Sequence, residues 1–267
     1  MMKIFKIGPN ETPRISELQH ITDRVDVFVA DPNNTTYKTI NGLVYSKDLS
    51  RLYAVPCCLQ GELVLPKETT DIWAGAFKQS SLTAVFGNNV ISIGAYTFKN
   101  SEVTLFQFPN IQEIGFNAYI DSKIEHIDLG QKLQYILTTA FKNTNLQYIE
   151  IPASTLGIQN SAFADCKSLQ KVVIHDRAAF PVIQFSERVF ANCTSLISFA
   201  APKGTVALSN EMFLNCCNLE HVILPNVEYI PNNIFKGCTS LQTLSLGCQC
   251  DVPEEIKKMG VEIEYRV

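Results

Sequence analysis

An aromatic residue recurs along this chain at a nearly constant spacing. The eight positions are separated by 21, 21, 22, 22, 27, 23 and 22 residues. They are Phe77, Phe98, Tyr119, Phe141, Phe163, Phe190, Phe213 and Phe235. An apolar residue precedes each aromatic by five positions, and a Ser, Thr or Cys follows it by three. A period of this length is typical of stacked repeats, so the sequence predicts a solenoid rather than separate globules.

Each unit continues with a short stretch in which apolar residues alternate with other residues. Leu146, Ile149 and Ile151 are one example, and a Pro follows them at position 152. Alternation is typical of a half-buried strand, and Pro ends a strand because it cannot donate to the next ladder. One such unit cannot bury its apolar face alone. About eight units of 21–23 residues are therefore expected to stack around one continuous, β-rich core.

The two ends of the chain lack the aromatic signature. Residues 1–66 are predicted to form an N-terminal module with a hairpin, residues 67–247 the solenoid continuous with it, and residues 248–267 a C-terminal cap. In the cap, Pro253 can open a short helix, Gly260 can stop it, and a charged strand can follow as a blunt edge. The stretch 175–184 is longer than its counterparts, so it is predicted to bulge as a loop from one face.

Several repeats resemble the BspA-like class of bacterial leucine-rich repeats. The stretches that carry the resemblance include "FADCKSLQKVVI", "FANCTSL" and "FKGCTSLQTLSL", and residues 29–56 resemble the hairpin module that often accompanies these repeats. The resemblance implies a right-handed leucine-rich-repeat coil with a β-hairpin at its start and a small α/β cap. It also implies a bacterial protein that is secreted or on the cell surface, is not catalytic, and serves in adhesion to host proteins or other cells.

Composition narrows the possible partners. The net charge is −4, and Lys and Arg form no run that could follow a phosphate backbone, so no nucleic-acid partner is predicted. No apolar run reaches the ~18–20 residues of a membrane span. The first residues lack the apolar core of a signal peptide. The compartment therefore stays open, although the resemblance favours the surface.

Nine cysteines, an odd number without a CxxC pair, favour free thiols. Four of them follow successive aromatics, at 166, 193, 216 and 238. These could stack as metal ligands, or each could fill the small buried site that Ser and Thr fill in earlier repeats. The second interpretation is favoured, because one thiol per repeat gives a line and not a tetrahedron. No metal and no cofactor are predicted.

Two outward positions on each predicted strand line up along the solenoid. The side chains that stand out among them form a predicted protein-binding strip. Its members are Phe86, Leu105, Glu125, His126, Asp128, Tyr148, Glu150 and Lys171. Exposed aromatics and mixed charges on a rigid sheet suit protein recognition. The alternative is a solvated face without a ligand.

No GxSxG, HExxH, GxGxxG or P-loop motif occurs in the sequence, so the chain is predicted not to be an enzyme. The predicted function is protein–protein interaction through the strip, by a monomer. A spacer element without a dedicated ligand site is the alternative. An enzyme is a third, weaker possibility, which would require a pocket that joins His126, Asp128 and a thiol.

Overall fold

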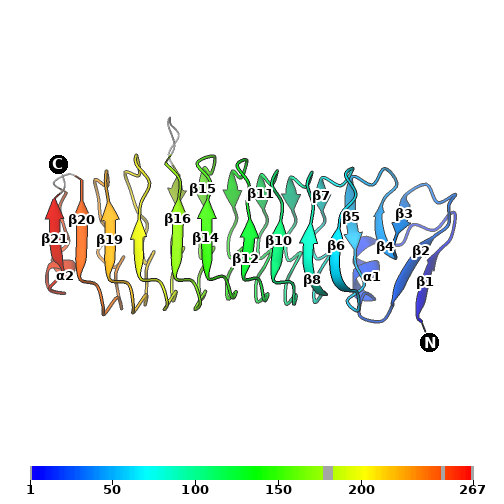
Figure 1. The fold of residues 1–267 in the computed structure, drawn as a ribbon, viewed down its shortest axis with the longest axis horizontal. Coiled ribbons are helices and arrows are strands. Elements are labelled where there is room, and N and C mark those ends of the chain that lie inside the picture. Colours follow the sequence, from blue (N-terminus) through cyan, green and yellow to red (C-terminus); the bar gives the residue numbers. More distant parts are fainter. Residues whose placement is uncertain (1, 177–182, 248–249, 266–267) are drawn as a thin grey trace.

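The computed structural model describes residues 2–176, 183–247 and 250–265. Within this part the chain forms a long coil, with the two termini at opposite ends (Figure 1). In Figure 1 the front strands point upward, the chain crosses over the top to the rear strands, and each turn advances toward the C-terminus. This path makes the coil right-handed. The predicted β-rich solenoid is confirmed.

Ten described strands form one side of the coil, which we call the strand face. They are β6 (Gln60–Val64), β8 (Ser81–Phe86), β10 (Leu105–Gln107), β12 (His126–Asp128), β14 (Tyr148–Ile151), β16 (Lys171–Ile174), β18 (Ser198–Ala200), β19 (His221–Leu224), β20 (Thr243–Leu246) and β21 (Glu262–Tyr265). The opposite side carries β5 (Arg51–Ala54), β7 (Asp71–Ile72), β9 (Ser92–Ile93), β11 (Glu113–Ile114), β13 (Tyr135–Ile136), β15 (Gly157–Ile158) and β17 (Gln184–Phe185). Paired neighbours within each side run parallel, because one full turn of the coil separates them.

The eight aromatic side chains stack in one column through the core. All eight are buried. Successive ring centroids lie between 4.7 and 5.9 Å apart, and the ring planes differ by 22° or less. This separation is close to the ~4.8 Å step between neighbouring strands. Each coil therefore adds one ring to the column, which explains the recurrence in the sequence.

In seven of the eight repeats, the turn around the aromatic places two residues in the left-handed backbone region. Around Phe163 these are Ser161 (φ 55°) and Asp165 (φ 63°). The second position after the aromatic is Asn or Asp in six repeats, at Asn100, Asp121, Asn143, Asp165, Asn192 and Asn215. These residue types tolerate the left-handed region better than other residues with a Cβ. Their side chains also join neighbouring coils: Asn192 Nδ2 donates to Asp165 Oδ1 at 2.8 Å.

The coil extends beyond the eight aromatic repeats. At its start, the Val55 amide donates to the carbonyl of Ala76 in the next coil. The Phe77 amide makes the equivalent hydrogen bond to the Thr97 carbonyl, so Val55 occupies the position of an aromatic. At its end, β21 pairs in parallel with β20. The solenoid therefore has more coils than the eight or so repeats predicted from the aromatic residues. End coils pack against capping elements, which removes the need for the repeat signature.

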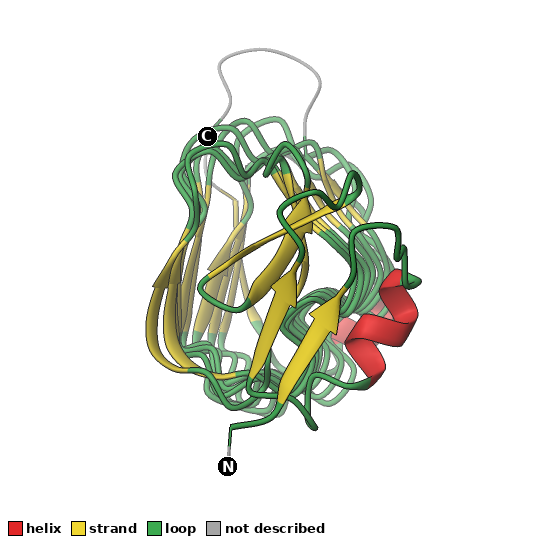
Figure 2. Cartoon of the chain, turned by 90° about the vertical axis from the view of Figure 1, so that its right-hand side faces the viewer, coloured by secondary structure: helices red, strands yellow, loops and turns green. Residues whose placement is uncertain are grey.

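Both ends of the solenoid are covered by short elements. At the N-terminus, β1 (Ile4–Ile7) pairs with β2 (Val27–Ala30), and the hairpin of β3 (Tyr37–Ile40) and β4 (Leu43–Ser46) adds to β5. Helix α1 (Ile15–His20) lies on the side away from the strand face (Figure 2). Within α1, Gln19 donates Nε2 to the carbonyls of Tyr53 and Ala74, at 2.9 and 2.6 Å, and so ties the helix to the first coils.

At the other end, α2 (Glu254–Lys257) follows Pro253 and precedes β21, as predicted for the cap. Gly260 has a φ of 73° and ends this helical segment. The division of the chain at residues 66 and 247 stays a prediction. Of the predicted loop at 175–184, residues 177–182 lie outside the described residues.

Candidate functional site

The hydrogen-bonded registers align the predicted strip along the strand face. Leu105 is paired with His126, and Gln107 with Asp128, across β10 and β12. Tyr148 is paired with Lys171 across β14 and β16. These pairings define two rows of outward side chains that run across the strands. Phe86, at the end of β8, and Glu150, on β14, lie in the same rows. Seven of the eight predicted residues thus share two neighbouring rows.

Exposure differs among these seven residues. Leu105 and Tyr148 are exposed by 42% and 38%, and His126, Asp128, Glu150 and Lys171 are also exposed, whereas Phe86 is half-buried. Glu125 lies apart from them, because it precedes β12 and its amide donates to the Thr104 carbonyl. It belongs to the turn below the strand, so the structure does not bring it into the two rows.

The strand face is divided between β12 and β14. β12 ends one hydrogen-bonded sheet and β14 begins another, although the two strands are neighbours in the coil. We call this boundary the seam. It coincides with the first repeat that lengthens from 21 to 22 residues, between Tyr119 and Phe141. The turn after β12 contains Gly130 (φ 56°), whose Cα lies so close to Pro109 that a Cβ would meet its carbonyl oxygen at 2.0 Å.

A hollow of about 340 Å³ opens on the strand face beside the seam. It is lined by Phe86, Leu105, Phe106, Gln107, His126, Ile127, Asp128 and Tyr148. A second hollow of about 260 Å³ adjoins it and shares Ile127, Asp128 and Tyr148. The predicted strip therefore surrounds a depression with an apolar floor. Sequence reasoning missed this floor, since Phe106 and Ile127 occupy inward positions, and only the change in repeat length signalled it.

A series of polar contacts borders the hollow on the side of the seam where β14 lies. Lys171 Nζ lies 5.9 Å from the ring centroid of Tyr148, and the Tyr148 hydroxyl donates to Glu150 at 3.1 Å. The other Glu150 oxygen contacts His175 Nε2. The hydrogen bond from His175, followed by that from Tyr148, lowers the pKa of the Glu150 carboxyl. Glu150 is therefore a carboxylate at neutral pH and is already partnered.

The hollow brings His126 and Asp128 together without a thiol. None of the residues that line it in the described structure is Cys, Ser or Thr. The combination required for the enzyme interpretation, a nucleophile beside His126 and Asp128, is thus not assembled at this position.

The four cysteines of the repeats are buried. Each thiol donates to the backbone carbonyl of the aromatic one repeat earlier, as Cys193 Sγ does to Phe163 at 3.1 Å. Burial raises the pKa of Cys238 to about 12 and also raises the pKa of Cys216. The thiols of Cys216 and Cys238 therefore stay protonated at neutral pH, which makes them poor nucleophiles and poor metal ligands.

Among the described residues, no three or more His, Cys, Asp or Glu side chains lie close enough together to hold a metal ion. Seven of the described cysteines are free thiols: Cys57, Cys58, Cys166, Cys193, Cys216, Cys217 and Cys238. Cys248 lies outside the described residues. Among the described helices, none is long and apolar enough to cross a membrane.

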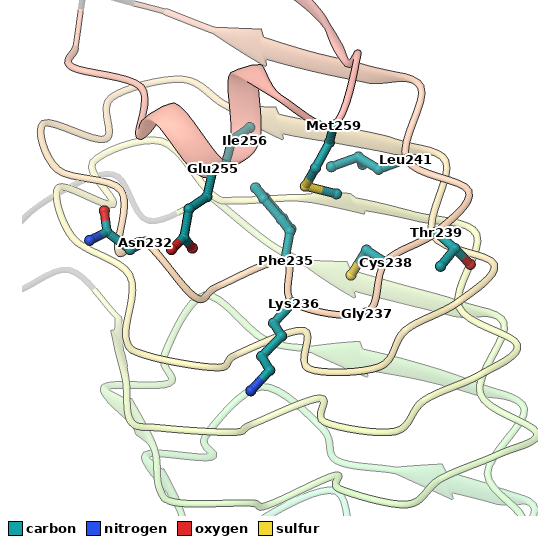
Figure 3. A pocket seen from close by; sticks show the side chains of 10 residues that line it. All are labelled: Asn232, Phe235, Lys236, Gly237, Cys238, Thr239, Leu241, Glu255, Ile256 and Met259. Atoms are coloured by element: carbon teal, nitrogen blue, oxygen red, sulfur yellow. The ribbon is translucent and has the colours of Figure 1, made fainter.

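A further pocket, of about 410 Å³, lies under the C-terminal cap (Figure 3). Phe235, the last ring of the aromatic column, lines it together with Cys238, Ile256 and Met259. In Figure 3, Ile256 of α2 and Met259 lie over the end of the last coil. The apolar side chains of the cap therefore cover the open end of the core, and the pocket is the space left beside them.

Comparison with known proteins gives a family and a fold. A family model described as "BspA type Leucine rich repeat region" matches residues 53–170 and 158–260, in six copies. Comparison with curated proteins gives no match.

Three solved structures of bacterial proteins are similar to this chain. A leucine-rich repeat protein from Eubacterium ventriosum is 19% identical, with a TM-score of 0.59, over 94% of this chain and 60% of that one. The pneumococcal vaccine antigen PcpA is 15% identical, with a TM-score of 0.49, over 99% and 56%. The leucine-rich repeat protein of T. pallidum is 19% identical, with a TM-score of 0.40, over 88% and 97%. The chain thus spans less than two thirds of the first two proteins, and its likeness to the E. ventriosum protein shows a shared fold.

Proposed function

Because this chain belongs to the BspA-type leucine-rich-repeat family, we propose that it is a non-catalytic module that binds another protein through its strand face. Repeat proteins of this architecture present extended faces on which a partner can lie. The strand face of this chain carries exposed apolar, aromatic and charged side chains in two aligned rows. A rigid surface of this composition suits protein recognition.

The hollow beside the seam is the observation that carries the proposal. Its centre is apolar, with Phe106 and Ile127, and its edge includes the polar side chains of His126 and Asp128. Protein interfaces commonly combine an apolar centre with a polar rim, and their strongest contacts fill such depressions. A spacer that only sets distance needs no depression of this kind. The hollow therefore favours binding over the spacer alternative.

The location and partner class that we propose follow the family. The resemblance implies a secreted or cell-surface protein, so the proposed partner is a cell-envelope protein or an extracellular protein of a host. The chain is proposed to act as a monomer, since the strand face is proposed for the partner and not for a second copy. Sedimentation velocity at micromolar concentration would test the monomer, and a dimer would contradict it.

The binding test compares two variants of the strand face. In the first, Phe86, His126 and Tyr148 around the hollow are replaced together by Ala. The matched control replaces Ser198, His221 and Thr243, which share one row farther along the same face. Affinity capture with quantitative mass spectrometry is expected to lose a defined partner with the first variant and keep it with the control. An unchanged set of captured proteins in all three samples would contradict the proposal.

A further inference from the structure

The floor of the hollow exposes a residue that belongs to the core. Ile127 is the inward-facing residue of β12, and it is only partly buried. At the strand position that Ile127 occupies, the inward residues of the other strands of the strand face from β8 to β20 are all buried. They are Val85, Phe106, Ile149, Val172, Phe199, Val222 and Leu244. At this position the solenoid core is thus accessible from the strand face only at β12, among the described strands from β8 to β20, and β12 borders the seam.

The opening is rimmed by further apolar side chains. Leu105, on β10, lies on one side of β12. Tyr148, on β14, lies on the other side of β12, across the seam. Both are exposed by more than a third. An apolar side chain placed between them would cover Ile127, Leu105 and Tyr148 at once, and removal of apolar surface from water is the main favourable contribution to association.

Asp128 supplies a charge at the same opening. Its Oδ1 accepts a hydrogen bond from the Gly130 amide at 2.8 Å. In the described part of the chain it has no ion-pair partner, whereas Glu150 contacts His175. Asp128 lines both hollows at the seam. A cationic group of a partner would therefore meet a carboxylate that the protein itself leaves uncompensated.

We infer that the seam is the docking position for an extended protein segment that carries a bulky aliphatic side chain and, two residues on, a Lys or Arg. The aliphatic side chain covers Ile127, and the cation contacts Asp128. In an extended segment, side chains two residues apart point to the same side, so one segment can make both contacts. This inference rests on the proposed function and names the chemistry of its partner.

The test uses three short peptides and the complete chain with labelled isoleucine methyl groups. The probes are acetyl-Leu-Gly-Arg-amide, the same peptide with Ala for Leu, and the same peptide with Glu for Arg. We expect a saturable shift of the Ile127 methyl signal with the Leu-Gly-Arg peptide. Both substituted peptides are expected to bind at least threefold more weakly. Absence of a saturable shift, or equal binding of the Arg and Glu peptides, would overturn the inference.

Two protein variants test the two contacts separately. Asp128→Asn is expected to abolish the preference for Arg over Glu, while Glu262→Gln, on the same face at β21, leaves it unchanged. Ile127→Phe is expected to fill the hollow and abolish peptide binding, which in this variant is followed through the backbone amide of Gln107 because the Ile127 methyl groups are absent. A preference that survives Asp128→Asn would overturn the inference. So would self-association that Ile127→Phe removes, because the occupant would then be a second copy of this chain.

These outcomes can be separated from failure of the proposed function. If the triple Ala variant loses its captured partner but no peptide binds at the seam, the strand face binds protein and the inference about the segment is wrong. If the partner is retained by the triple Ala variant, the proposed function itself fails.

Discussion

Phe141 and Phe163 stack with parallel rings in consecutive coils, with ring centroids 5.1 Å apart and 2° between the ring planes. The same arrangement joins each aromatic of the repeats to the next. Such contacts contribute stability beyond the area that they bury. The column therefore holds the strand face in a fixed register, which a docking surface requires.

Loss of one ring from the column should destabilise the whole protein. Phe163→Ala is expected to lower the free energy of unfolding by about 3–5 kcal/mol, because it leaves a cavity in a closely packed core. The control is Phe116→Ala, at a ring that is 48% exposed, with an expected effect below about 1 kcal/mol. Chemical denaturation followed by circular dichroism measures both. Equal midpoints for the two variants would show that the column is not part of the stabilising core.

The tight turn after β12 should not tolerate a side chain at Gly130. Gly130→Ala and Gly61→Ala share the penalty for a left-handed residue with a Cβ, about 1–2 kcal/mol. The added Cβ meets the Pro109 carbonyl oxygen at 2.0 Å in the first case and nothing within 4 Å in the second. Gly130→Ala is therefore expected to cost more than Gly61→Ala by over about 2 kcal/mol. Comparable thermal midpoints would contradict the close approach seen at this turn.

The exposed thiol of Cys58 should react only slowly at neutral pH. Partial burial, and then the neighbouring Asp26 carboxylate, raise its pKa above the ordinary thiol value of about 8.5. Because the thiolate is the reactive form, the rate of alkylation by iodoacetamide should rise about tenfold per pH unit from pH 7 to 8.5. Asp26→Asn should increase the rate at pH 8. A rate that levels off below pH 8 would mean that the pKa is lowered instead.

Glu150 should titrate below the usual range of a glutamate. The carboxylate is stabilised first by the hydrogen bond from His175 and then by that from Tyr148. Carbon-detected NMR titration is expected to show a rise in the Glu150 pKa in His175→Ala and a smaller rise in Tyr148→Phe, since each variant removes a partner of the charged form. If neither variant raised the pKa of Glu150, the hydrogen bonds from His175 and Tyr148 to Glu150 would be absent in solution.

Most of the fold could be predicted because one constraint repeats in every coil. The ring at Phe190, the left-handed Asn192 and the buried Cys193 each do in one coil what equivalent residues do in the next. A motif that is seen eight times defines the period, the strand positions and the inward face. The capping helix was also predictable, because Pro253 and Gly260 mark its limits.

The details of the site depended on neighbouring coils, which a single repeat does not specify. Ala84 and Ser245 occupy outward positions, yet both are buried. Ala84 is a short side chain with Glu62 of β6 beside it, and Ser245 donates to Glu264 of β21 at 2.7 Å. Ile127 is partly exposed beside the seam, where β12 ends one hydrogen-bonded sheet and β14 begins another. Neither effect can be predicted from the residues of one repeat alone.

The most direct test of the strand face as the binding surface places a photocrosslinking residue, benzoylphenylalanine, at Gln107 or at Gln112. Both glutamines are exposed and belong to one repeat, but Gln107 lines the hollow on the strand face and Gln112 precedes β11 on the opposite side. Irradiation in the presence of cell-envelope or host extracellular proteins is expected to link a defined partner at position 107 and none at position 112. A partner linked at position 112 and not at position 107 would contradict the central claim that the strand face is the binding surface.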